Sequence, residues 1–228
     1  MEKIVCFGAG PIFKGGLASY NTSLAKALDA NENVEVHIVS WTQQYPSIIP
    51  RDFIDRKSKT DQLEGTRIKV HYVTNYNNPL TWRKTVKLIR EINPSKMIIQ
   101  WSIAAQGLPL GRMVRMLQKK TGIEIIFDLH FVIQKENSKI DRICTKYALS
   151  IARTVIVHSL KTGKELEALF PAKKFFYVSK HVKPDGKPET QIIKLYHPVY
   201  DMYKPDPSFD VNKKIGRASC RERVCSVV

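Results

Sequence analysis

The sequence predicts an α/β fold in which helices cover both faces of a doubly wound, mainly parallel sheet. Short runs rich in β-branched residues alternate with longer stretches whose apolar residues recur at helical spacing. This alternation is typical of βα units wound around a parallel sheet. The chain has 228 residues, of which 43% are hydrophobic, enough to bury one good core.

Seven strands and five helices are expected along the chain. The strands are apolar runs at Lys3–Phe7, Val34–Trp41, Arg67–Val73, Lys96–Trp101, Glu124–Leu129 and Thr154–His158, with a weaker one at Ile192–Tyr196. The helices, each with one apolar face, are Leu17–Ala30, Thr81–Ile92, Leu110–Lys120, Ser138–Ile151 and Ser159–Phe170. Pro94 should end the second helix, Gly122 should cap the end of the third, and Ser159 should cap the start of the fifth. Right-handed crossovers should join the strands.

Two segments interrupt the βα repeat. Residues Thr42 to Gly65 include Pro46, Pro50 and a mixed-charge run, which predicts an irregular loop at the ligand edge of the sheet. After His197 the chain is rich in proline, a composition typical of an interdomain linker. We therefore expect one domain over residues 1–200 and the start of a linker over residues 201–214.

Residues 215–228 read IGRASCRERVCSVV and show neither a helical nor a strand period. They resemble a translated vector or sequencing read-through, so we expect a non-native tail in place of a continuing natural chain. The alternative is a Cys-x4-Cys motif for metal or redox use. Two cysteines without further ligands make a poor zinc site, and DNA sequence beyond codon 214 decides between these interpretations.

The chain is strongly basic. With 37 Lys and Arg against 21 Asp and Glu, its formal net charge is +16, which favours polyanionic partners such as nucleic acid, anionic lipid headgroups or phosphorylated substrates. The basic residues are spread over several predicted helices, as expected for solvated helix faces. No nucleic-acid-binding motif is visible, so a specific nucleic-acid module is disfavoured.

The sequence predicts a cytoplasmic protein. No apolar run approaches the roughly 18 residues that span a bilayer, and Met1-Glu2-Lys3 leads directly into a predicted strand instead of a signal peptide. The four cysteines are too few and too scattered for a disulfide framework, and Cys6 and Cys144 lie in apolar patterns.

A glycine-rich loop follows the first predicted strand and precedes the first predicted helix. It runs from Gly8 through Gly10 to the pair Gly15 and Gly16. A dinucleotide fingerprint would need glycine where Phe13 stands, and a P-loop would need Lys and Ser or Thr directly after Gly15, so both are disfavoured. The residues support two interpretations equally: the loop binds an anion at the helix start, or it only shapes a tight turn.

Four pieces of the sequence, in order, resemble one family. They are the run GAGPIFKGGLASYNTSLAKAL at residues 8–28, the strand end Asp128-Leu-His130, the segment ARTVIVHSLKTGKEL at 152–166 and KLYHPVYD at 194–201. Together they are similar to the N-terminal domain of family 4-like glycosyltransferases, which have the GT-B fold.

The resemblance implies two Rossmann-like domains that face each other across a cleft. The first would bind a glycan or lipid-linked acceptor and the second, missing here, a nucleotide sugar; transfer would retain configuration without a metal or other cofactor. It assigns Gly15 and Gly16 to the donor diphosphate, through their backbone, and His130 to the donor sugar and acceptor. The charge of the basic helices, for its part, suits an enzyme that docks on anionic lipid at the inner face of the cell membrane. This chain alone should be inactive.

Further candidate site residues are inferred only from their positions in the predicted helices and strands. Tyr20 and Asn21 on the first helix, and Trp101 and Ser102 at the end of the fourth strand, could contact the acceptor; Tyr20 could equally pack, and core packing is the favoured role of Trp101. Asp128 is either a partner for a histidine or, as we favour, a turn residue. The remaining histidines include His158, read as part of a structural strand-to-helix junction, and His37, His71 and His197, which lack metal-ligand spacing; no zinc site is expected.

Overall fold

The computed structural model describes residues 1–45, 53–56, 61–119, 121–133, 138–182 and 189–195. The described residues all belong to one compact unit, Met1–His197, and residues 196–228 lie outside the described part of the chain. The expected linker at 201–214 and the tail at 215–228, with Cys220 and Cys225, therefore lie outside the described part of the chain as well.

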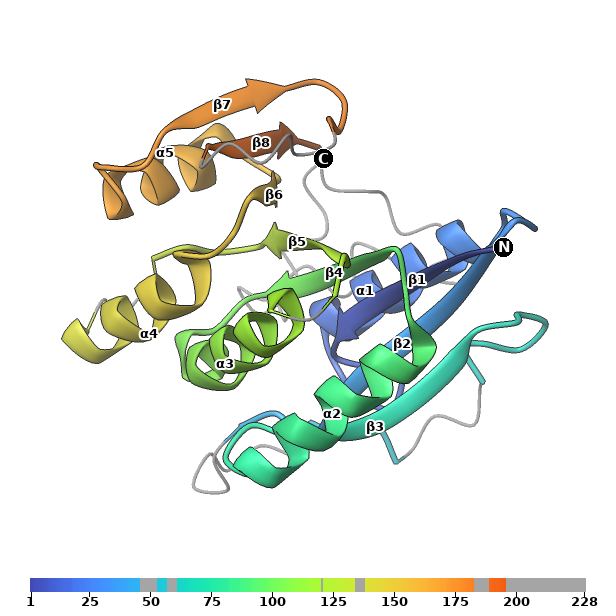
Figure 1. Cartoon of the computed structure of the whole chain (residues 1–228). Helices are drawn as coiled ribbons and strands as arrows, with labels where there is room; N and C mark the ends of the chain where they lie inside the picture. The colour runs from blue at the N-terminus through green and yellow to red at the C-terminus, as the bar shows by residue number, and fades with distance from the viewer. Residues whose placement is uncertain (46–52, 57–60, 120, 134–137, 183–188, 196–228) are drawn as a thin grey trace, which may run out of the picture. The chain divides into compact units, whose positions relative to one another are not determined.

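A parallel sheet forms the centre of the described unit (Figure 1). Among the described residues it has eight strands in the order β3-β2-β1-β4-β5-β6-β8-β7, and every pair is parallel. The strands are β1 Glu2–Gly8, β2 Val34–Gln43, β3 Lys69–Asn75, β4 Lys96–Trp101, β5 Glu124–Leu129, β6 Thr154–Val157, β7 Phe175–Val178 and β8 Thr190–Lys194. The predicted α/β fold class is confirmed. The sequence did not predict β7, whose four residues are all at least partly exposed at the sheet edge and lack a clear apolar alternation.

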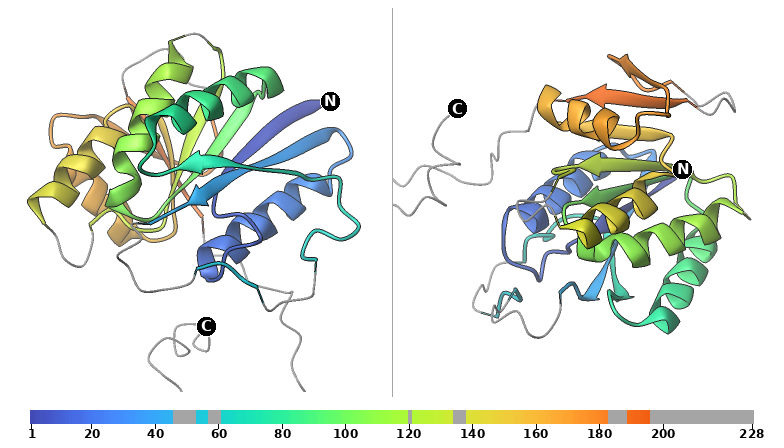
Figure 2. Two further views of the ribbon diagram at one scale, coloured as in Figure 1. Left: turned by 90° about the horizontal axis from the view of Figure 1, so that it is seen from below. Right: turned by 90° about the vertical axis from the view of Figure 1, so that its left-hand side faces the viewer.

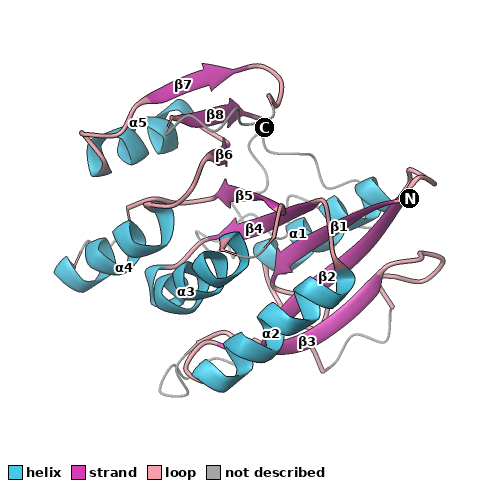
Figure 3. Cartoon of the chain, in the orientation of Figure 1, coloured by secondary structure: helices cyan, strands magenta, loops and turns pink. Residues whose placement is uncertain are grey.

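Five α-helices and one 3-10 turn connect the strands in the described part of the chain (Figure 3). They are α1 Gly16–Asp29, α2 Pro79–Ile92, the turn Ala104–Gln106, α3 Gly107–Gln118, α4 Lys139–Leu149 and α5 Leu160–Leu169. Ser159 caps α5 as predicted, because its side chain accepts a hydrogen bond from the Thr162 amide. Asn93 ends α2 in the left-handed conformation just before Pro94.

The predicted cap at Gly122 is wrong. Helix α3 ends at Gln118, and its C-cap Lys119 keeps right-handed helical torsions. The backbone amide and hydroxyl of Thr121 both donate to the Leu117 carbonyl oxygen, at 3.1 and 2.9 Å, and so satisfy the end of the helix. No left-handed glycine is needed there.

Helices cover both faces of the sheet, as the doubly wound prediction requires (Figure 2). Leu24, Ala25 and Leu28 of α1 pack in the smaller of two core clusters, against Ile4, Cys6, Ile98 and other residues of that sheet face. Helices α2 to α5 contribute to the larger cluster on the opposite face. The β1–α1–β2 and β4–α3–β5 connections leave the adjacent strands β1 and β4 in opposite directions, and α/β sheets bind ligands at the carboxyl ends of the strands at such a point.

Part of the expected irregular segment lies at this same carboxyl edge. β2 extends to Gln43, and residues 46–52 and 57–60 lie outside the described residues. Ile54 forms an antiparallel bridge with Phe13 of the glycine loop, and the Lys14 amide donates to the Phe53 carbonyl oxygen at 2.7 Å. The described part of the segment therefore borders the glycine loop.

Candidate functional site

The glycine loop contains two pairs of glycines with different environments. A Cβ added to Gly8 would lie 2.9 Å from Cγ of Gln100, and one added to Gly10 would lie 2.9 Å from the Tyr72 ring. These two glycines are therefore needed for close packing. A Cβ at Gly15 or Gly16 would meet nothing within 4 Å, so the second pair faces open space. The tight-turn interpretation thus fits the first pair, and the anion-site interpretation remains open for the second.

Gly15 starts helix α1 with a conformation that other residues rarely adopt. Its φ of 106° and ψ of 168° lie in a region accessible almost only to glycine. It is the N-cap residue, and no side chain caps the helix start. Its carbonyl oxygen accepts hydrogen bonds from the Ala18 and Ser19 amides. Helix α1 therefore presents an exposed N-terminus without an acidic residue in its first turn, which favours an anion.

His130 lies one residue beyond β5 and on the same sheet face as Asp128, because side chains two positions apart along an extended strand share a face. Its Nε2 atom donates to Oε1 of Gln100 at 2.7 Å. Gln100 belongs to the neighbouring strand β4 and is the register partner of Asp128. Two adjacent strands thus fix the orientation of the His130 ring.

A second imidazole, which sequence reasoning treated as structural, lies beside His130. His158 follows β6 and donates from Nε2 to Oδ1 of Asp128 at 2.7 Å. The Asp128 and His158 side chains are only 1% and 10% exposed. Asp128 is therefore a histidine partner and not the turn residue that we favoured. A carboxylate within an apolar strand was the available signal, since a buried charge needs a partner.

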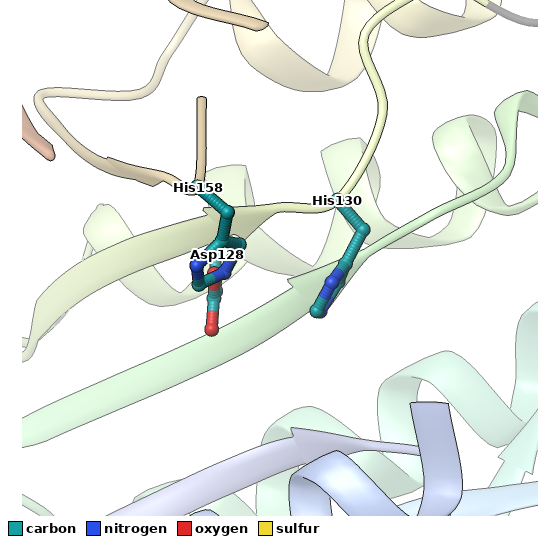
Figure 4. Close-up of side chains that lie close together, drawn as sticks. All are labelled: Asp128, His130 and His158. Atoms are coloured by element: carbon teal, nitrogen blue, oxygen red, sulfur yellow. The ribbon is translucent and has the colours of Figure 1, made fainter. Parts of the chain in front are cut away.

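Tyr20 of α1 completes the group. Its ring meets the His130 and His158 rings edge-on, with centroids 4.8 and 5.6 Å away, and the two imidazoles stack with centroids 5.3 Å apart. Tyr20, Gln100, Asp128, His130 and His158 are called the edge cluster below; Figure 4 shows its aspartate and histidines. The site thus joins the carboxyl ends of β4, β5 and β6 to the first turns of α1.

The other acceptor candidates have different environments. Asn21 is fully buried and donates from Nδ2 to the Ala9 carbonyl oxygen at 3.1 Å, so it holds the backbone of the glycine loop in place. Trp101 is 0% exposed in the larger core cluster, and its indole has no surface on which a sugar could stack. Core packing is therefore its role, and its proposed contact with an acceptor is corrected. Ser102 is partly exposed directly after β4.

A second pair of histidines lies on β2 and β3, away from the edge cluster in the fold. His37 donates from Nε2 to Glu35 at 3.0 Å, so the Nδ1 of neutral His37 accepts from Nε2 of His71 at 3.1 Å. Burial lowers the pKa of both imidazoles below their ordinary value. The hydrogen bond from Lys69 is the main cause that lowers the pKa of Glu35 to about 2. This network stabilises one edge of the sheet.

One hollow of the surface lies away from the edge cluster. It is lined by Lys146, Phe170, Lys173 and other residues around them. Lys173 donates to the carbonyl oxygen of Ala152, which precedes β6, so the hollow lies near the amino end of that strand. Parallel α/β sheets bind their ligands at the carboxyl ends, so the edge cluster is the better candidate site.

Comparison with known proteins does not assign the chain to a family. No protein-family model matches the chain, and no curated protein sequence matches it either.

Proposed function

We propose that this chain is the acceptor-side domain of a glycosyltransferase that uses a nucleotide-sugar donor. The observation that carries the proposal is the position of His130, oriented by Gln100 and flanked by Tyr20, at the carboxyl ends of β4 and β5. The exposed helix start at Gly15 and Gly16 supplies the second part, and the resemblance in sequence order supports the same function.

The chemistry divides between these two parts. Backbone amides at the start of α1 would stabilise the charge that develops on the departing diphosphate. Gln100 and Tyr20 fix the orientation of the His130 imidazole, which would hydrogen-bond to hydroxyls of the donor sugar or the acceptor. A second domain, implied by the resemblance, would hold the nucleotide. Retention of configuration is part of the same proposal.

Two measurements test this function. In the first, amide resonances of this chain are followed while UDP, GDP or inorganic pyrophosphate is added. We expect the largest shifts at Gly15 and Gly16. Shifts confined to the basic outer faces of α2, α3 and α5 would reflect general charge and would refute the diphosphate site.

In the second, the protein is expressed from its genomic locus, with the DNA beyond codon 214 sequenced, and assayed for hydrolysis or transfer of nucleotide sugars. His130→Ala should lower kcat/KM by about 10²–10³-fold, in the range seen when one polar group at a reacting centre is removed. His71→Ala, which removes an imidazole elsewhere in the sheet, is the matched control. Full activity in His130→Ala would remove His130 from the mechanism.

A measurement of turnover distinguishes the proposed glycosyltransferase from the main alternative function. A binding domain for a phosphorylated ligand would use the same glycine pair and the same carboxyl edge without chemistry. It would show the amide shifts at Gly15 and Gly16 but no turnover of any nucleotide sugar. A specific nucleic-acid module is motivated by the +16 charge alone and would require sequence preference in binding.

An anionic membrane surface is the proposed location of the acceptor. No helix in the described residues is long and apolar enough to cross a bilayer. Helix α4, however, exposes Ile140 and Ile143 at 72% and 66%, and Lys139, Arg142 and Lys146 are exposed around them. Such a helix face suits the interface of an anionic bilayer, where each basic residue contributes about 1 kcal/mol to the free energy of membrane binding.

Co-sedimentation with vesicles tests the membrane proposal. We expect binding to vesicles that contain phosphatidylserine or phosphatidylglycerol, weaker binding in Ile140→Ser/Ile143→Ser, and loss of binding at high salt. Lys84→Ser/Lys87→Ser on α2 is a matched control for charge on another helix. Absence of binding to anionic vesicles at low salt would remove the proposal.

A further inference from the structure

Three side chains of the edge cluster carry atoms that bind metals. Asp128, His130 and His158 each offer one such atom, and these atoms lie within 4.8 Å of one another. No second group of this kind occurs among the described residues. Figure 4 shows the three side chains gathered beside the ends of β5 and β6. We propose that this group binds a divalent first-row transition-metal ion of the zinc type.

The donor set fits this class of metal. Two imidazole nitrogens and one carboxylate oxygen suit Zn²⁺, and three protein ligands leave a fourth position for water or an added ligand. Ligand atoms about 2.0–2.1 Å from a tetrahedral zinc lie about 3.4 Å apart. The most widely spaced of the present atoms must therefore approach by at most about 1.4 Å, whereas Nε2 of His158 and Oδ1 of Asp128, which are hydrogen-bonded at 2.7 Å, would exchange that bond for the ion if both served as ligands. Rotations about χ1 and χ2 can supply this, because the three residues lie on neighbouring strand ends.

An unsatisfied atom points independently to a ligand. Oδ1 of Asp128 accepts from His158, but Oδ2 is buried and has no hydrogen-bond partner. Leaving one oxygen of a buried carboxylate without a partner is costly, and a cation removes that cost. The hydrogen bond from His130 to Gln100 also resembles the outer contacts that orient metal-binding histidines.

The metal site goes beyond the proposed glycosyl transfer, and neither the resemblance nor the sequence spacing predicted it. It uses His130, so an ion bound here would take this imidazole away from a sugar. Binding of the ion needs no donor, acceptor or second domain. A titration with metal alone therefore tests the site separately from the enzyme activity.

The experiment is a calorimetric titration of the full chain with ZnCl₂. The protein carries no polyhistidine tag, is stripped with a chelator, and has Cys220→Ser and Cys225→Ser so that tail thiols do not bind the ion. We expect one ion per chain with a dissociation constant in the micromolar range or below. His130→Gln and His158→Gln should each weaken binding about tenfold or more, whereas His71→Gln should change it less than about twofold.

A measurement on the parent protein guards against variants that fail to fold. Side-chain ¹⁵N resonances of His130 and His158 should shift when Zn²⁺ is added, and those of His37 and His71 should not. Circular dichroism identifies any unfolded variant, whose affinity is then set aside in favour of these resonances. Absence of stoichiometric binding, equal affinity in folded His130→Gln and His158→Gln, or shifts at His37 and His71 alone would overturn the proposal.

Discussion

Replacing each of the two glycines before α1 by alanine separates backbone strain from ligand contact. The residues are adjacent, both are exposed, and a Cβ at either position meets no atom within 4 Å. They differ in backbone conformation, since Gly15 has a φ of 106° and Gly16 is the first residue of the helix, without a positive φ. The two alanine variants therefore serve as controls for each other, since they differ only in the backbone conformation at the substituted residue.

The expected magnitudes have opposite signs. Gly15→Ala forces a side chain into a region open almost only to glycine, which should lower the free energy of unfolding by about 1–3 kcal/mol. Gly16→Ala reduces the freedom of the unfolded chain and places a good helix former in α1, which should raise that free energy by up to about 1 kcal/mol. For a domain of this size, 1 kcal/mol moves Tm by about 2–4 °C.

Urea unfolding followed by far-ultraviolet circular dichroism measures these changes. Amide shifts during titration with UDP then measure ligand binding in the same variants. Although Gly16→Ala should be the more stable protein, its methyl group would occupy the space proposed for the diphosphate and weaken binding. If Gly16→Ala binds UDP as well as the parent protein does, the backbone of this residue does not approach the diphosphate. If Gly15→Ala is as stable as the parent, the strain argument is wrong.

Three further variants, the first with a glycine control, test packing and pH dependence in the fold. Gly107→Ala would place a Cβ 2.5 Å from a backbone carbonyl oxygen of α4 and should cost about 1–3 kcal/mol in urea unfolding, whereas Gly122→Ala has open space and should stay within about 0.5 kcal/mol. Because burial lowers the pKa of His37 and His71 in the folded state, the unfolded chain takes up protons first as the pH falls. Their stabilisation is complete above about pH 6.5 and is lost below it, so stability of His37→Gln/His71→Gln should depend less on pH between about 5 and 7. Trp101→Ala should lower stability by about 3–5 kcal/mol, as expected for a core residue; unchanged stability with a higher acceptor KM would instead restore its role as a sugar platform.

The regular elements of the fold could be predicted from sequence because local patterns determine them. The apolar runs at Lys96–Trp101 and Glu124–Leu129 match β4 and β5 without any shift. Helix α2 begins two residues before the predicted start because Asn78 caps it and Pro79 suits its first turn. Strand β7 could not be predicted, because pairing with β8 defines it and a short edge strand has little pattern of its own.

The sequence alone also placed His130 at the carboxyl edge and separated the glycine loop from the dinucleotide and P-loop patterns. Only the tertiary structure decided which side chains meet there. Asp128 and His158 are 30 residues apart, and their contact depends on β6 pairing beside β5 in one register. Likewise, Gln100 and Trp101 are adjacent in β4, so their side chains lie on opposite faces of the sheet. The packing of α3 on one face places the Trp101 indole in the core, and Gln100 contacts His130 on the other. Sequence spacing reports neighbours along one helix or strand, whereas the site is assembled across three strands and a helix by sheet pairing.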